Sequence, residues 1–177
     1  IGTMHEGEGM LHRIGTIRTD PKASGGQTWG VDGTDDRADF LAYGRYTFFP
    51  AGRYDVIFRI VSGGDQSAEP VAKLEVVQDQ GKQILVEKEL YPVDFSNRNG
   101  FVDHIVTLNL SGAVSDLEAR IWVYPHQNFS VDYIYIKPSF VPDSPTDIQI
   151  QELFYSPYLV KQEDEFRADP QKSIWEM

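Results

Sequence analysis

Three carboxylates that lie far apart in the sequence are of a type that binds a hard cation. Glu6 and Glu8 are two positions apart, so in an extended segment both side chains point to the same side. Asp132 has the same parity as Ile134 and Ile136, which places it on their face of a strand. If that face is the core, an ionised carboxylate there needs a cation or dense hydrogen bonding. Calcium takes about six to eight oxygen ligands, which three carboxylates and backbone carbonyls can supply.

The same residues also have a simpler interpretation. Glu6 and Glu8 can belong to a frayed, glycine-rich N-terminus, and Asp132 can cap a turn. Both interpretations stay open at this point, and the metal set Glu6, Glu8 and Asp132 with a structural Ca²⁺ is the one we carry forward.

Other patterns of reactive residues are missing from the sequence. It has no cysteine, which excludes disulfides, thiolate nucleophiles and cysteine zinc sites. Its four histidines lack zinc-enzyme spacing, and neither G-x-S-x-G nor a glycine-rich phosphate loop is present. The acidic loop that contains Asp32, Asp35, Asp36 and Asp39 lacks the calcium-loop pattern and is interpreted as solvated. We therefore expect no enzyme. A spatial pair of carboxylates for glycoside hydrolysis stays open, because the chain has 27 acidic residues.

Charge and composition exclude further classes. The 177 residues carry a net charge of −11, which argues against a nucleic-acid partner because contact with phosphates needs a basic surface. Hydrophobic residues make up 41% and aromatic residues 12%, enough to fill one core. No apolar run reaches the roughly 20 residues of a membrane span. The compartment stays undecided, with an extracellular or cell-envelope location favoured.

Short runs of period-two alternation dominate between residues 10 and 137, a pattern typical of an all-β domain. From Tyr54 to Ile60, alternate apolar residues share one face, whereas Asp55 and Arg59 share the other. The strand is therefore half buried. Comparable runs are 38–43, 71–78, 83–90, 102–110, 117–124 and 129–137.

These runs favour a two-layer antiparallel β-sandwich, most simply a jelly roll. The gaps between them are too short for the crossovers of a parallel sheet. We expect residues 38–137 to be almost wholly antiparallel strand, without an α-helix longer than two turns. The residues expected in the core include Val56, Phe58, Leu74, Val76, Val106, Leu108, Ile121, Val123, Ile134 and Ile136.

The character of the sequence changes after Pro138. We predict a β-sandwich module over residues 1–140 and a linker or tail over 141–177, partly extended or with a short helix from Ser144. Because the chain begins at Ile1, we interpret it as a fragment of a larger protein with another domain beyond the tail.

The order of several motifs resembles the galactose-binding-like jelly roll of carbohydrate-binding module families 6 and 35. The matching segments run in sequence from Glu6-Gly7-Glu8 through a glycine-rich turn to an aromatic strand, an A-G-x-Y-x-V-x-x-R strand and a D-x-I-x-I strand. They are Glu6 to Glu8, Ala23 to Gly26, Tyr43 to Tyr46, Ala51 to Arg59 and Val131 to Ile136. In the resembling modules, an E-x-E and an Asp of the last strand hold a structural calcium, which implies that role for Glu6, Glu8 and Asp132.

The resemblance also implies where a sugar would bind. Trp29, Phe101 and Asn128 occupy the positions of two aromatic platforms and an amide, and Tyr124 and His126 share the loop with Asn128. Aromatic rings cover the CH faces of a sugar, whereas amides and charged groups fix its hydroxyls. Packing in the core is the alternative role for Trp29 and for Phe101.

Three functional hypotheses follow. The first is a non-catalytic module that binds a poly- or oligosaccharide, linked covalently to a catalytic or assembly domain. The second is a structural or protein-interaction β-sandwich, appended to a bacterial polysaccharide-processing or glycosyltransferase protein, without sugar binding. The third is a small glycan-active enzyme with two carboxylates in a groove.

Overall fold

A computed structural model of the chain describes residues 2–63, 68–95 and 100–139. The chain divides into two units, residues 1–139 and residues 140–177. The predicted linker or tail over 141–177 lies outside the described residues. Within the described residues, none of the helices has the length and apolar character needed to cross a membrane.

The described part of the chain is built from short to medium strands and two 3₁₀ turns. The turns are η1 (Gly7–Gly9) and η2 (Pro92–Phe95). The strands are β1 (Thr3–Glu6), β2 (Thr16–Thr19), β3 (Gln27–Asp32), β4 (Asp39–Ala42), β5 (Thr47–Phe49), β6 (Gly52–Ser62), β7 (Ala72–Gln78), β8 (Gln83–Leu90), β9 (Val102–Leu110), β10 (Val114–Val123) and β11 (Asn128–Pro138).

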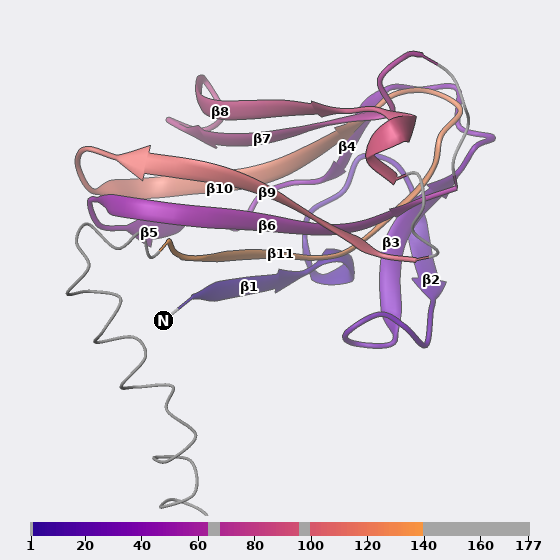
Figure 1. Cartoon of the computed structure of the whole chain (residues 1–177), viewed down its shortest axis with the longest axis horizontal. Helices are drawn as coiled ribbons and strands as arrows, with labels where there is room; N and C mark the ends of the chain where they lie inside the picture. The colour runs from indigo at the N-terminus through magenta and orange to yellow at the C-terminus, as the bar shows by residue number, and fades with distance from the viewer. Residues whose placement is uncertain (1, 64–67, 96–99, 140–177) are drawn as a thin grey trace, which may run out of the picture. The chain divides into compact units, whose positions relative to one another are not determined.

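The strands form two antiparallel sheets that stack as layers (Figure 1). The first sheet has the order β2-β3-β11-β6-β9, and β1 pairs with β11. The second sheet has the order β4-β10-β7-β8, and β5 pairs with β10. This two-layer arrangement confirms the predicted jelly-roll β-sandwich.

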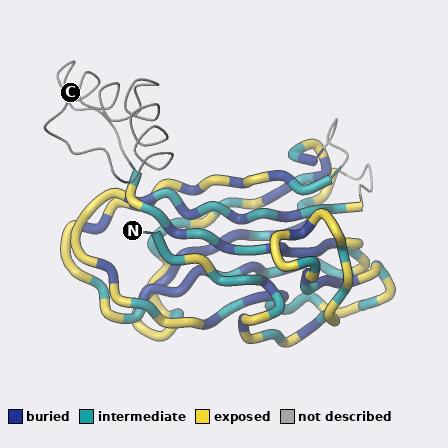
Figure 2. Tube along the Cα trace, turned by 90° about the horizontal axis from the view of Figure 1, so that it is seen from below, coloured by how far each residue is buried: buried dark blue, intermediate teal, exposed yellow. Residues whose placement is uncertain are grey.

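The core lies between the inner faces of the two sheets. Buried and less buried positions alternate along the strands, as the tube in Figure 2 shows for the long strands. All ten residues expected in the core are buried, and Val56, Phe58, Leu74, Ile121 and Ile134 have no exposed surface. Burial of the shared apolar face stabilises the sandwich by roughly 1.5–3 kcal/mol per large side chain. The sequence alternation therefore predicted the inner face correctly.

A β-bulge at Asp132 interrupts this alternation in β11. Val131 pairs with Ile60 and Tyr133 pairs with Arg59, so Asp132 is the extra residue between them. As a result Val131 and Ile134 are both in the core although they are three positions apart. The prediction that Asp132 shares the face of Ile134 was wrong, because parity is lost across a bulge.

The bulge lies where the neighbour of β11 changes. Residues 128–131 of β11 pair with β3, whereas residues 133–136 pair with β1 along the same edge. Asp132 therefore sits at the gap between β3 and β1, the point at which the N-terminal segment reaches the first sheet.

Candidate functional site

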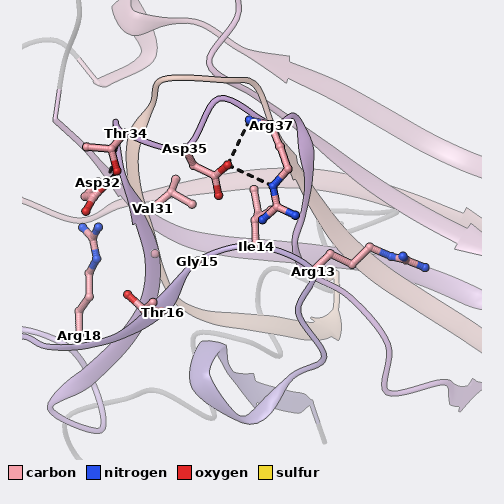
Figure 3. A pocket seen from close by; sticks show the side chains of 11 residues that line it. Arg13, Ile14, Gly15, Thr16, Arg18, Val31, Asp32, Thr34, Asp35 and Arg37 are labelled. Carbon is pink, nitrogen blue, oxygen red and sulfur yellow. Dashed lines mark hydrogen bonds and ion pairs between the residues drawn. The ribbon is translucent and has the colours of Figure 1, made fainter.

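A hollow of about 320 Å³ opens where the chain enters β2 and leaves β3 (Figure 3). Its lining residues come from the segment that leads into β2, from β2 and β3, and from the loop that follows β3. We call it the first hollow. Its lining residues are Arg13, Ile14, Gly15, Thr16, Arg18, Gly30, Val31, Asp32, Thr34, Asp35 and Arg37.

Two carboxylates in the first hollow are held by residues two positions further along the chain. Asp32 Oδ1 accepts hydrogen bonds from the Thr34 amide at 3.0 Å and the Thr34 hydroxyl at 2.6 Å. Asp35 Oδ1 accepts from the Arg37 amide at 3.1 Å and from Arg37 Nε at 3.4 Å. Short Asp side chains form such local turns readily, which is why this loop keeps its shape.

These contacts keep both carboxyls ionised. The hydroxyl and the amide of Thr34 lower the pKa of Asp32 below its usual value. The amide and then the side chain of Arg37 lower the pKa of Asp35 in the same way. Each carboxylate is therefore a hydrogen-bond acceptor near neutral pH.

The three arginine side chains that line the first hollow point in different directions. In Figure 3, the guanidinium groups of Arg18 and Arg37 stand on opposite sides of the hollow, whereas Arg13 points away from it. Arg13 instead approaches Asp39 at 4.0 Å. The hollow therefore offers charged donors beside charged acceptors, the combination that fixes hydroxyl groups.

A second hollow of about 220 Å³ adjoins the first on the outer face of the same sheet. Its lining residues are Arg18, Thr19, Asp20, Thr28, Val61, Gly63, Asn128 and Ser130. The hydroxyl residues Thr28 and Ser130 are nearly buried, which places them low in the hollow, and Asn128 is exposed. The Gly63 amide donates to the Asn128 carbonyl at 2.7 Å, and a Cβ on Gly63 would lie 2.8 Å from Asn128 Nδ2. Glycine at position 63 therefore leaves room for the Asn128 amide.

Trp29 and Asn128 lie on opposite faces of the first sheet. Trp29 pairs with Val131, whose side chain is in the core, whereas Asn128 pairs with Asp32, whose side chain is on the outer face. The ring of Trp29 stacks on His12 at a centroid distance of 3.8 Å. Its Nε1 donates to the Ile14 carbonyl at 2.8 Å, and the ring packs against the core. The structure does not bring these two predicted site residues into one cleft.

The other three predicted ligand residues lie at three different places. Phe101 packs beside the Arg59 guanidinium, 5.2 Å from its ring centroid, on the outer face of the first sheet. The Tyr124 hydroxyl donates to Glu89 at 3.2 Å, at the end of the second sheet. His126 is exposed, and its backbone amide donates to the Asp35 carbonyl at 2.8 Å. Asn128 thus lines the second hollow and His126 contacts the loop of the first, whereas Phe101 and Tyr124 line neither hollow.

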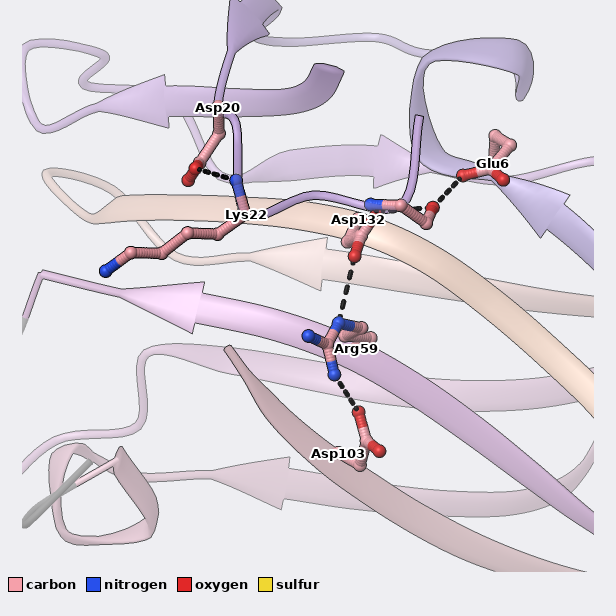
Figure 4. A network of polar contacts seen from close by, with 7 residues as sticks. Glu6, Asp20, Lys22, Arg59, Asp103 and Asp132 are labelled. Carbon is pink, nitrogen blue, oxygen red and sulfur yellow. Dashed lines mark hydrogen bonds and ion pairs between the residues drawn. The ribbon is translucent and has the colours of Figure 1, made fainter. Parts of the chain in front are cut away.

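Two of the predicted metal residues, Glu6 and Asp132, are joined through Ser24 at the bulge (Figure 4). Asp132 is fully buried, and its Oδ1 accepts from the amide and the hydroxyl of Ser24, each at 2.9 Å. Its Oδ2 accepts from Arg59 Nε at 2.9 Å. Arg59 also approaches Asp103 at 3.4 Å. Asp132 is therefore satisfied by protein groups alone.

Glu6 and Glu8 approach the same turn with unsatisfied acceptor capacity. Glu6 Oε2 lies 2.7 Å from the Ser24 hydroxyl, which also contacts Asp132 and has only one proton to donate. Glu8 Oε2 is buried without a hydrogen-bond partner, and a Cβ on Gly25 would lie 3.3 Å from Glu8 Oε1. These surplus oxygens are of the type that calcium takes. Among the residues that the structure describes, however, no three acidic or histidine side chains form a ready metal cluster.

The sequence interpretation missed the residues that line the first hollow. It treated the acidic loop as solvated, and Asp32 is exposed, but Asp32 and Asp35 also line the first hollow. A local signal was present in the sequence: each Asp is followed two positions later by a residue, Thr34 or Arg37, whose amide and side chain can bond it. Arg18 gave no such signal, because its role depends on strand pairing.

Comparisons with known proteins identify the fold. No protein-family model matches the sequence, and no curated protein matches it. Among solved structures, the C-terminal family 6 carbohydrate-binding module of a Zobellia galactanivorans laminarinase matches with a TM-score of 0.55 at 15% identity, over 77% of this chain and 99% of that one. A family 35 module from Clostridium thermocellum matches with a TM-score of 0.50 at 17% identity, over 76% of this chain and 97% of that one.

A third match is part of a larger protein. The GH26-CBM35 β-(1,4)-mannanase of Podospora anserina matches with a TM-score of 0.54 at 17% identity, over 81% of this chain but 29% of that one. The resemblance predicted from the sequence motifs is thus found in the fold, that of family 6 and family 35 carbohydrate-binding modules. At these identities the likeness concerns the fold.

Proposed function

We propose that this protein is a non-catalytic carbohydrate-binding module that binds a poly- or oligosaccharide in the two adjoining hollows. The observation that carries the proposal is the set of ionised Asp, Arg, amide and hydroxyl groups that line them in a fold shared with carbohydrate-binding modules. Sugar hydroxyls both donate and accept, so a lining that offers both functions suits them. Asn128 supplies a donor and an acceptor in one side chain, as the sequence predicted for a sugar contact.

The carboxylates of the first hollow support binding over hydrolysis. Glycoside hydrolysis needs one carboxylic acid with a raised pKa that protonates the leaving group. Asp32 and Asp35 both have pKa values lowered by their hydrogen bonds, so neither is suited to be that acid. This favours a binding role over the hypothesis of a small glycan-active enzyme.

The apolar side chains on the outer face of the first sheet test the alternative that this protein is a protein-interaction module. One row of apolar side chains crosses it, formed by Met4, Tyr135, Ile57 and Ile105 in register on four strands. A charged or polar row flanks it on each side, one with Arg59 and Asp103 and the other with Asp55, Thr107 and Lys137. Within the described residues, the apolar side chains of this face therefore form a narrow row and not the broad patch that would mark a protein interface.

Calcium at the bulge is a further part of the proposal. The surplus oxygens of Glu6 and Glu8 beside Ser24 support it, and Asp132 would complete the set with oxygens it shares with Ser24 and Arg59. A ligand that binds only the folded state stabilises it by about 2.7 kcal/mol at a hundredfold excess over Kd.

Chelation tests the calcium site. Removing calcium should lower the melting temperature by about 5–11 °C, at roughly 2–4 °C per kcal/mol for a domain of this size. The Glu8→Gln variant should lose this response, since its buried oxygen has no other partner. An unchanged melting temperature when calcium is added to a metal-free sample would remove the metal from the proposal.

The last part of the proposed function is a second domain, covalently linked to this module. The Podospora protein combines GH26 and CBM35 in one chain. We propose that this module likewise serves a covalently linked catalytic or assembly domain, which it would hold near the polysaccharide.

A glycan array tests the function directly, with the wild-type protein beside the Asn128→Ala variant. The proposal predicts binding to at least one glycan by the wild type and weaker binding by the variant. Arg53→Ala is the matched control, because Arg53 is exposed on β6 and lines neither hollow. An array without a hit, from a folded sample, would favour the interaction-module alternative.

A further inference from the structure

Arg18 lies between the two hollows and lines both of them. It stands on β2, and its Nη1 donates to Asn128 Oδ1 on β11 at 3.4 Å. Because β3 lies between β2 and β11, the side chain of Arg18 spans a whole strand. On the other side its guanidinium faces Asp32, as Figure 3 shows. Arg18 therefore divides one continuous depression into two compartments.

Gly30 makes this crossing possible. It lies in the middle of β3, paired with Thr16 on β2 and with Ser130 on β11. A Cβ at this position would collide with the Ser130 hydroxyl and lie 2.6 Å from the Phe129 carbonyl oxygen. The Ser130 hydroxyl therefore takes the space that a side chain at position 30 would fill, and Ser130 lines the second hollow.

Each compartment has the size and the polar groups for one ring. The hollows measure about 320 and 220 Å³, and we assign one sugar ring to each. The first hollow offers Asp32 and Asp35, whereas the second offers Thr28 and Asn128. Arg18 contacts both sets, and each set has donors and acceptors of its own for one sugar.

We propose that the two hollows are consecutive subsites and that Arg18 binds the oxygens around the glycosidic linkage that joins their sugars. This inference rests on the proposed function. A guanidinium carries five N–H donors in a planar fork, and the hydrogen bond to Asn128 is long and uses one of them. The remaining donors face the boundary between the hollows, where a linkage and its neighbouring hydroxyls would lie. The ligand recognised is thus a chain segment of at least two units and not a terminal monosaccharide.

Calorimetric titration with sugars of increasing length tests the inference. The probes are glucose, cellobiose and cellotriose, with the mannose and the β-1,3-glucose series beside them. The disaccharide of the preferred series should bind on the order of tenfold more tightly than its monosaccharide, because the second subsite adds one or two hydrogen bonds. The trisaccharide should add little, since the proposal assigns one sugar to each of the two hollows.

Two variants test whether Asn128 and Arg18 cause the tighter binding of the disaccharide. Asn128→Ala should abolish the advantage of the disaccharide over the monosaccharide. Arg18→Ala should weaken both and also abolish the advantage. Arg53→Ala, the control, should match the wild type, and melting curves should show that all variants fold.

The outcomes separate this inference from the proposed function. Equal affinities for monosaccharide and disaccharide would leave sugar binding intact and overturn the two subsites. An Asn128→Ala variant that keeps the wild-type ratio would also overturn them. Failure of every probe to bind would contradict the proposed function itself and this inference with it.

Discussion

The buried carboxylate of Asp132 should contribute strongly to stability, and Asp103 should contribute little, although both pair with Arg59. Asp132 is fully buried and accepts three hydrogen bonds at 2.9 Å, two from Ser24 and one from Arg59. The Asp103 side chain is 45% exposed and approaches Arg59 at 3.4 Å. The two carboxylates share one cation, so they form a matched pair of sites that differ in burial.

The size of the effect follows from these contacts. In Asp132→Asn, the amide oxygen can still accept from Ser24, but an NH₂ group then faces Arg59 Nε, so two donors oppose each other. Loss of a charged hydrogen bond costs about 1.5–3 kcal/mol, and a buried unpaired donor costs about 1–3 kcal/mol more. Because the Arg59 side chain is 31% exposed and can turn to water, we expect about 3 kcal/mol in total. Asp103→Asn should cost between about 0 and 1 kcal/mol, as exposed ion pairs do.

Urea unfolding of both variants measures the difference. The titrations should contain a chelator, so that a lost metal ligand does not add to the effect at Asp132. A loss below about 1 kcal/mol for Asp132→Asn, or equal losses for the two variants, would refute the reasoning that burial decides the strength of this pair.

Three further predictions concern the hollows and the residues behind them. Thr34→Val should raise the pKa of Asp32 toward its usual value, because the hydroxyl bond to the carboxylate is lost. As the pH is lowered, the variant should therefore lose sugar binding at a higher pH than the wild type does. Carboxyl NMR titration measures the pKa, and an unchanged value would contradict the prediction. Trp29→Ala should lower the free energy of unfolding by about 2–4 kcal/mol, because the ring packs on the core, whereas an exposed platform would leave thermal unfolding unchanged. Gly30→Ala should cost about 1–3 kcal/mol in urea unfolding, because a Cβ has no room beside the Phe129 carbonyl, and a neutral effect would show that the strands can separate there.

The sequence was sufficient to predict the strands and the inner face of the sandwich. Alternation in β6 placed Val56 and Phe58 in the core, because the two-residue period of a strand is a local property. The same argument failed at Asp132, since a bulge shifts the parity by one residue and nothing in the local pattern marks it.

The candidate site depended on contacts that local patterns do not contain. Trp29 and Asn128 were expected in one cleft, but the register between β3 and β11 sets their faces, and the two residues are 99 positions apart in the sequence. Arg18 meets Asn128 across 110 positions of sequence. Asp32 and Thr34 were within reach of sequence analysis, because their contact spans two residues.

Backbone-amide NMR with the best glycan from the array tests the central claim most directly, because it locates the ligand without a substitution. We predict that the amide signals that move on titration belong to residues around the two hollows, such as Arg18, Gly30, Gly63 and Asn128. Signals near Tyr124, at the end of the second sheet, should stay in place and act as an internal control. Shifts confined to the second sheet, or to the outer face around Phe101, would contradict the assignment of the sugar site to the hollows.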